Sequence, residues 1–208
     1  MSHRHSDHVA GSKTASVRLP DDVFEVLAGD PAIVRVDLVG SRARGDALPE
    51  SDWDFKITTG AFAEVQGRLP ALAARLSPVA AQWDRLSSTW CYMLILAGPV
   101  KVDLIFTEPH SVQPAWQVTA ATLPGIDAHF WDWMLWLSTK QHAGKADLVA
   151  AELSKMHEHL LAPLGIAAEP TMLGQAIEDY RKARQICEQR LRCRVSRALE
   201  QAVTSGLR

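Results

Sequence analysis

Two aspartates separated by a single tryptophan are the feature of this sequence most suited to chemistry. Asp52 and Asp54 stand at the start of an apolar segment, "DWDFKI". Alternate residues of a strand face the same side, so both carboxylates point one way while Trp53 points into the core. A third carboxylate, Asp103, interrupts the apolar segment "VKVDLIF". Carboxylates converging from neighbouring strands repel unless they bind a cation, and such oxygens suit Mg²⁺. The pattern predicts that these three aspartates are catalytic and hold metal.

An ordinary structural role explains each aspartate taken singly. Asp52 could cap a turn, Asp54 could pair with Lys56 or an arginine, and Asp103 could pair with Lys101. The three acids occur together, however, and they follow a Gly-Ser turn. That combination favours the metal interpretation.

The Gly-Ser turn ends the apolar run 33–39 and carries the features of a phosphate site. Gly40 allows the backbone to approach a ligand closely. Backbone N–H groups at such a turn, with the Ser41 hydroxyl, form a cradle for an anion, and Arg44 adds a cation nearby. The run lacks the Lys-Ser/Thr of a P-loop. With a metal on the aspartates, the arrangement predicts phosphoryl or nucleotidyl transfer by positioning and charge neutralisation.

The segment "GSRARGDALPESDWDF" resembles the signature of the polymerase-β-like nucleotidyltransferase superfamily. That signature is an apolar strand, Gly-Gly or Gly-Ser, a short spacer, Asp-apolar-Asp/Glu, and a third acid on a later strand. The resemblance implies that Asp52 and Asp54 hold two Mg²⁺ ions and that Asp103 completes the catalytic one. It implies that Ser41 and Arg44 bind the β- and γ-phosphates of a nucleoside triphosphate, with ATP as the first choice. Pyrophosphate is then released as the nucleotide joins an acceptor.

The resemblance extends to small bacterial members, the aminoglycoside and minimal nucleotidyltransferases, in chain size and in an appended helical domain. The segment "HAGK" resembles kanamycin-type enzymes, in which a lysine touches the triphosphate, so it implies that Lys145 binds nucleotide. Those enzymes carry a glutamate base four residues earlier, whereas this chain has Gln141, whose amide cannot take a proton. Either Asp103 or His142 is then the base, or the acceptor differs from an aminoglycoside.

Composition sets the class of protein and of partner. The chain has 208 residues, 47% hydrophobic and 22% charged, with a formal net charge of −2. This is an ordinary globular composition without the positive charge needed to bind a long nucleic acid. The three cysteines have no metal-ligand spacing, which favours a reducing cytoplasm, and no apolar run is long enough for a membrane span. We therefore expect a cytoplasmic monomer or homodimer that acts on a small-molecule acceptor.

Residue patterns predict an α+β fold, a small mixed or antiparallel sheet with flanking helices, followed by a C-terminal helical bundle domain. The predicted strands are 33–39, 53–58, 79–83, 90–97 and 100–106. The predicted helices are 21–28, 61–76 (with Pro70 bending or interrupting it), 126–142, 147–161 and 171–203. The predicted division is a flexible N-terminus (1–20), a nucleotidyltransferase catalytic domain (21–108), a proline-marked linker (109–124) and a helical domain (125–208).

Two other functions fit parts of the pattern. One is a minimal nucleotidyltransferase of a toxin–antitoxin type that modifies a protein or RNA partner, and the other is a catalytically idle nucleotide-binding protein. Three intact acids argue against idleness, and the long helical half argues against the shortest antitoxin forms. The tryptophans of 126–142 are interpreted mainly as core, with an acceptor-binding wall as the alternative. The arginines of the last helix are interpreted as a solvated face.

Overall fold

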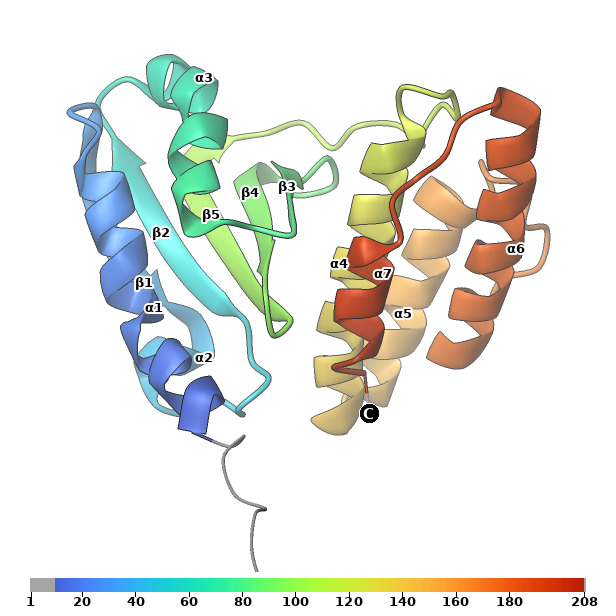
Figure 1. Cartoon of the computed structure of the whole chain (residues 1–208), viewed down its shortest axis with the longest axis horizontal. Coiled ribbons are helices and arrows are strands. Elements are labelled where there is room, and N and C mark those ends of the chain that lie inside the picture. The colour runs from blue at the N-terminus through green and yellow to red at the C-terminus, as the bar shows by residue number, and fades with distance from the viewer. Residues whose placement is uncertain (1–9, 208) are drawn as a thin grey trace, which may run out of the picture.

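A five-stranded mixed sheet forms the centre of the first half of the molecule (Figure 1). The computed structural model describes residues 10–207, with side chains from residue 18. The strands are β1 (Ile33–Val39), β2 (Trp53–Thr59), β3 (Ala80–Trp83), β4 (Thr89–Leu96) and β5 (Val100–Pro109). All five predicted strands are present, and the predicted α+β class with a C-terminal helical region is confirmed.

The order of strands across the sheet is β1-β2-β5-β4-β3. Strands β2 and β5 pair in parallel at its centre, and the other neighbours pair antiparallel. A parallel pair needs a long crossover, supplied here by α3 (Phe62–Ala73), β3 and β4. The register of β2 and β5 sets Asp54 directly beside Asp103, although the two are far apart in the chain.

Helices α1 (Ala10–Ala28) and α3 (Phe62–Ala73) cover one face of the sheet, and α3 continues as a short 3₁₀ turn, η1 (Ala74–Leu76). The short helix α2 (Gly40–Arg44) follows β1. Phe55, Leu69 and Leu104 are among the residues fully buried between this helical layer and the sheet.

Helix α1 is longer than the predicted 21–28, because Pro20 lies inside the helix rather than before it. Proline removes one helical hydrogen bond, but Leu19, Val23 and Leu27 lie on one side of α1 and are buried against the sheet. Pro70 likewise lies within α3 without interrupting it. The first nine residues of the predicted flexible N-terminus lie outside the described residues.

Four helices make up the second half: α4 (Leu123–His142), α5 (Ala146–Met156), α6 (Leu173–Leu191) and α7 (Ala198–Thr204). A single turn of π-helix, η2 (His157–Leu161), extends α5. Helix α4 lies between the sheet and the other helices (Figure 1). Its buried side chains share a second core with Leu86 and Ile95 on the sheet side and with α5, α6 and α7 on the other. No helix within residues 10–207 is both long and apolar enough to cross a membrane.

The predicted continuous helix 171–203 is wrong, because the chain leaves the helix at Arg192. Arg192 adopts a left-handed conformation with φ of 53°, which ends α6. The Glu188 carboxylate then accepts hydrogen bonds from the Val195 N–H at 2.7 Å and from the Arg197 guanidinium at 2.6 Å. These bonds hold the turn that leads into α7.

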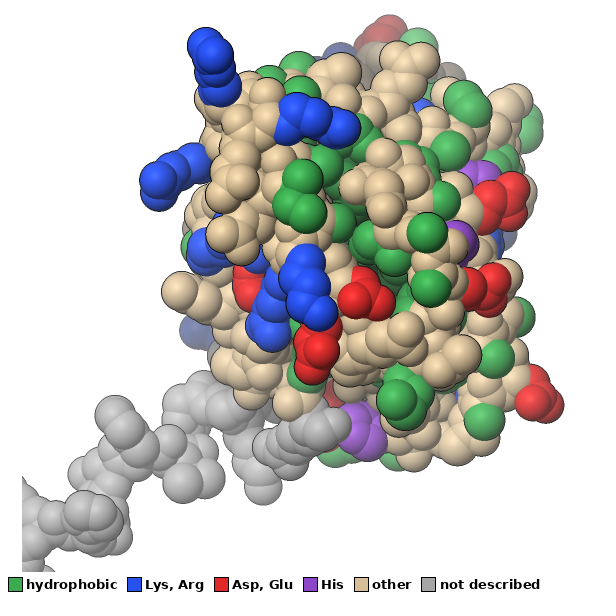
Figure 2. All heavy atoms as spheres, turned by 90° about the vertical axis from the view of Figure 1, so that its right-hand side faces the viewer, with side chains coloured by type: hydrophobic (Ala, Val, Ile, Leu, Met, Phe, Trp, Pro, Cys, Tyr) green, Lys and Arg blue, Asp and Glu red, His purple; other side chains and the backbone are tan. Residues whose placement is uncertain are grey.

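One arginine of α6 is buried rather than solvated, so the interpretation of a solvated face fails for it. Arg184 is 2% exposed, and its Nη1 donates to Asp127 Oδ1 at 2.6 Å. Tyr180 donates its hydroxyl to the same oxygen, and Glu200 pairs with the other end of the guanidinium. The outer face of the helical half still carries basic side chains, which gather toward one side of it in Figure 2.

Candidate active site

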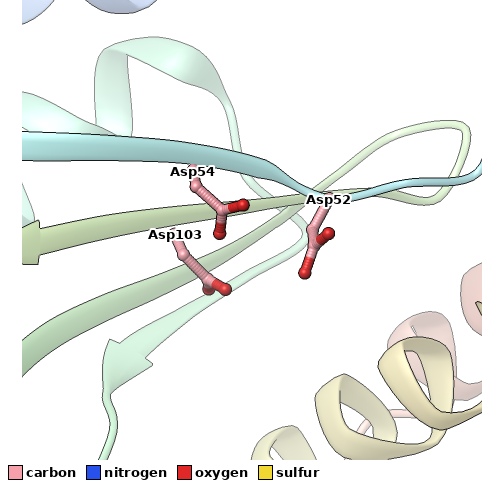
Figure 3. A group of neighbouring side chains, drawn as sticks. All are labelled: Asp52, Asp54 and Asp103. Atoms are coloured by element: carbon pink, nitrogen blue, oxygen red, sulfur yellow. The ribbon is translucent and has the colours of Figure 1, made fainter. Parts of the chain in front are cut away.

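The three predicted acids converge on the face of the sheet that α1 and α3 leave open (Figure 3). Asp52 immediately precedes β2, Asp54 lies on β2, and Asp103 lies on β5. One carboxylate oxygen from each lies within 4.8 Å of the others. Trp53 and Phe55, the residues between and after the first two acids, are buried in the core on the opposite face. The alternation read from the sequence therefore places the acids together.

The negative charges of the three carboxylates repel one another, and a cation bound among them would relieve that repulsion. Burial, and then the charges of Asp52 and Asp103, raise the pKa of Asp54 from its usual 3.8 to about 6. Burial also raises the pKa of Asp103, and the neighbouring Lys101 opposes this change. A divalent cation would remove the repulsion, and three carboxylate oxygens are the donor type that Mg²⁺ prefers. The residues present thus fit the metal that the sequence predicts.

Gly40 brings the Gly-Ser turn into direct contact with the acids. Val39 pairs with Asp54 across β1 and β2, so Gly40 begins α2 beside that carboxylate. Its φ is +70°, and a Cβ at this position would lie 2.1 Å from Asp54 Oδ2. Only glycine fits at this position. The close approach of the turn places Ser41 near the acids, at the end of β1 and the start of β2.

The segment "SRAR" contains two arginines, Arg42 and Arg44. Sequence reasoning assigned no role to Arg42, but the structure gives it a defined structural one. Arg42 donates hydrogen bonds to the carbonyls of Ser51 and Asp52 and stacks over Trp53 at 4.0 Å. It therefore holds the loop that presents Asp52. Arg44, predicted to bind phosphate, has a side chain 64% exposed and pairs with Asp46 at 3.3 Å. Its phosphate role stays a prediction.

Helix α4 adds charged residues to the site, and sequence reasoning missed one of them, Lys140. Lys140 Nζ lies 3.9 Å from Asp52 Oδ1. Asp132 accepts hydrogen bonds from Lys101, which also binds Asp103 at 2.6 Å, so the Lys101–Asp103 pair exists in addition to the acidic cluster. Asp132, Trp136 and Lys140 recur every four residues and hence share one helix face. This spacing in the sequence could have indicated that the three side chains point to the same site.

The other predicted nucleotide contact, Lys145, lies in the turn between α4 and α5. Lys145 directly precedes α5 and is exposed, as are Gln141 and His142. The structure gives these three side chains no contact with the acids among the residues it describes. Lys145 as a nucleotide ligand and His142 as a base stay predictions.

A cavity of about 220 Å³ adjoins the acids between the sheet and helices α4 and α5. Its walls include Asp84, Asp103, Asp132, Trp133, Trp136 and Glu152. Trp131, by contrast, is fully buried in the core. The core interpretation is therefore right for Trp131 and for Trp133, which is 7% exposed, and Trp136 packs against the same core. Trp133 and Trp136 also line the cavity.

The raised pKa of Asp54 predicts a pH-dependent stability of the metal-free protein. A folded-state pKa of about 6 against 3.8 means that the fold binds this proton more tightly than the unfolded chain does. The contribution is complete below about pH 4 and is lost as the pH rises through about 6. Relative to Asp54→Asn, the wild-type free energy of unfolding should fall by about 2–3 kcal/mol between about pH 4 and 7.5. Urea unfolding of both proteins in EDTA measures this, and a difference independent of pH would refute it.

Comparison with known proteins agrees with this geometry. Residues 23–110 match the nucleotidyltransferase domain family. The matched region contains the whole sheet, the Gly-Ser turn and all three acids. By this match, residues 23–110 form a nucleotidyltransferase domain.

No curated protein sequence matches the chain. Among solved structures, an aminoglycoside 6-adenyltransferase from Bacillus subtilis is similar at 11% identity and a TM-score of 0.33, over 89% of this chain and 95% of that one. The polymerase core of TRAMP, an RNA surveillance complex, is similar at 12% identity and a TM-score of 0.39, over 85% of this chain and 59% of that one. Neither likeness bears on the substrate of this chain.

Proposed function

We propose that this protein transfers a nucleoside monophosphate, AMP from ATP in the first instance, to a hydroxyl group of a small molecule. The observation that supports this most is the convergence of Asp52, Asp54 and Asp103 beside the Gly40 turn. Magnesium held by these acids would neutralise the charge that develops on the phosphates. The acceptor oxygen bonds to the α-phosphorus, the α–β phosphoanhydride bond breaks, and pyrophosphate leaves.

Separate residues of the chain would bind the phosphates and accept the proton. Ser41, the backbone at Gly40, and Arg44 hold the β- and γ-phosphates, with Lys145 closing from the helical half. The hydroxyl proton passes to Asp103 or to His142. Gln141 stands where kanamycin-type enzymes carry glutamate and takes no proton.

The acceptor occupies the cavity beside Asp103. Trp133 and Trp136 offer flat apolar surface to a ring, and Asp84 and Glu152 offer negative charge to amino groups. These features support an amine-bearing, aminoglycoside-like acceptor. The volume of about 220 Å³ is below the range usual for drug-sized ligands, so one ring of such a molecule enters while the rest stays outside.

A screen of acceptors tests the proposal. Pyrophosphate release from ATP and Mg²⁺ is measured with aminoglycosides, simple amino sugars and neutral sugars, and the product is identified by mass spectrometry. We also expect ATP to raise the melting temperature in Mg²⁺ and to lose this effect in EDTA. Equal stabilisation by ATP in EDTA would contradict the role given to the acids.

Lys145 gives a prediction specific to the helical half. Losing one charge-assisted contact to the triphosphate costs about 1.5–3 kcal/mol, so Lys145→Ala should raise the KM for ATP or lower kcat roughly ten- to a hundredfold. Acceptor KM should barely change. The control is Lys182→Ala, because Lys182 is an exposed lysine of α6, and this variant should keep the wild-type kinetics. If Lys145→Ala is silent and Lys140→Ala carries the loss, the lysine near Asp52 is the one that meets the triphosphate.

A further inference from the structure

A buried lysine joins the third acid of the site to the helical half. Lys101 and Asp103 are two residues apart on β5, so their side chains leave the same face of the sheet. Lys101 Nζ lies 2.6 Å from Asp103 Oδ1, and 2.9 and 3.0 Å from the two oxygens of Asp132 on α4. Lys101 is 7% exposed and Asp132 is 6% exposed. Asp103 is thus the only acid of the three with a lysine within hydrogen-bonding distance, among the residues that the structure describes.

The two carboxylates share one ammonium group, and this sharing decides how much charge Asp103 offers to a cation. Burial alone lowers the pKa of Lys101, but Asp103 and Asp132 together raise it well above its ordinary value, so the ammonium stays charged. Asp132 engages the ammonium with both of its oxygens, whereas Asp103 uses Oδ1. The shortest contact of Lys101 is with Asp103, but Asp132 shares the charge of the lysine, and Asp103 Oδ2 receives no hydrogen bond from it and is left for the sheet side.

We propose that Lys101 and Asp132 are positioning residues for the metal site. Lys101 fixes the orientation of Asp103 through Oδ1, and Asp132 balances Lys101 so that the lysine does not neutralise Asp103. The inference rests on the proposed function, because it assumes that the acids bind a divalent cation. It adds that a residue of the helical half, which touches neither metal nor nucleotide, sets the affinity of a metal site on the sheet.

The test is Mn²⁺ binding to the full chain without nucleotide, followed by the electron paramagnetic resonance signal of the free ion. Asp132→Asn keeps the shape of the side chain but leaves Lys101 opposed by Asp103 alone. Loss of a partner in the outer shell of a metal site typically weakens binding about ten- to a hundredfold, and we expect that range here. Adding Lys101→Met to Asp132→Asn removes the unbalanced cation, so the double variant should bind Mn²⁺ several-fold more tightly than Asp132→Asn.

Asp127→Asn is the matched control. Asp127 is also a buried acid of α4, 2% exposed, but its partner is Arg184. This variant should lose stability and keep its Mn²⁺ affinity, which separates positioning from a general loosening of α4. Circular dichroism confirms folding of each variant.

The outcomes distinguish this inference from the proposed function. If the wild type does not bind Mn²⁺, or Asp54→Asn binds it equally well, the metal site itself fails. If both of those controls behave as expected and Asp132→Asn binds like the wild type, only the inference fails. A double variant that binds no better than Asp132→Asn also overturns it, since Asp132 then does not act through Lys101.

Discussion

Replacing Asp54 with asparagine is expected to reduce nucleotidyl transfer by roughly a thousandfold or more while the fold persists. The charges of both other acids act on Asp54, its register partner is Asp103, and the turn at Gly40 lies against its carboxylate. The amide keeps the shape of the side chain but removes the charge that would hold the metal. The measurement is kcat with a working acceptor at saturating ATP and Mg²⁺.

Asp37→Asn is the matched control for this variant. Asp37 lies on β1 and pairs with Arg35 at 2.7 Å, outside the acidic cluster. It should keep full turnover. Unchanged turnover in Asp54→Asn would instead return Asp54 to a purely structural role.

Replacing Gly40 with alanine should cost nearly as much activity, although alanine carries no charge. A methyl group would have to occupy space 2.1 Å from Asp54 Oδ2, so the carboxylate or the turn must move. Displacing a catalytic group by about 1 Å costs on the order of a hundredfold in rate. The backbone at φ of +70° adds strain of about 1–2 kcal/mol to the folded state. Steady-state kinetics and thermal unfolding measure the two effects separately.

Gly45→Ala separates strain from collision. Gly45 ends α2 with φ of +78°, and a Cβ added there would meet no atom within 4 Å, so alanine at this position introduces strain alone. It should lose a similar amount of stability and keep its turnover. Equal turnover in the two variants would mean that the close approach at Gly40 does not position Asp54.

The strands and the acids were accessible from the sequence because their signals are local. Period-two alternation around Trp53 predicts which side chains share a face, and apolar runs predict strands whatever the topology. The ends of helices were less accessible. Arg192 ends α6 in a left-handed conformation that favours glycine, so the residue type gave no warning.

Long-range charge partners were not accessible either. The pair of Lys101 and Asp103, weighed as the ordinary alternative to a metal role, was accessible because the two are close in sequence, but the second partner of Lys101, Asp132, is separated from it by 31 residues. Likewise Arg184 looked solvated because acidic residues are interleaved with the arginines of this segment, whereas its partner Asp127 comes from another helix. Such pairs depend on which helix faces which, and one sequence does not specify that.

Helix α4 packs against both halves of the chain. One side of this helix buries Leu86 and Ile95, and its other side buries the helical core. A fragment that stopped before Leu123 would expose Leu86 and Ile95 to solvent, and Lys101 would lose its hydrogen bonds to Asp132. We therefore expect residues 23–110 to lose stability when they are separated from α4. A change in the bundle that tilts α4 would also move Lys140 and Asp132, and so would alter the charges that surround the three acids.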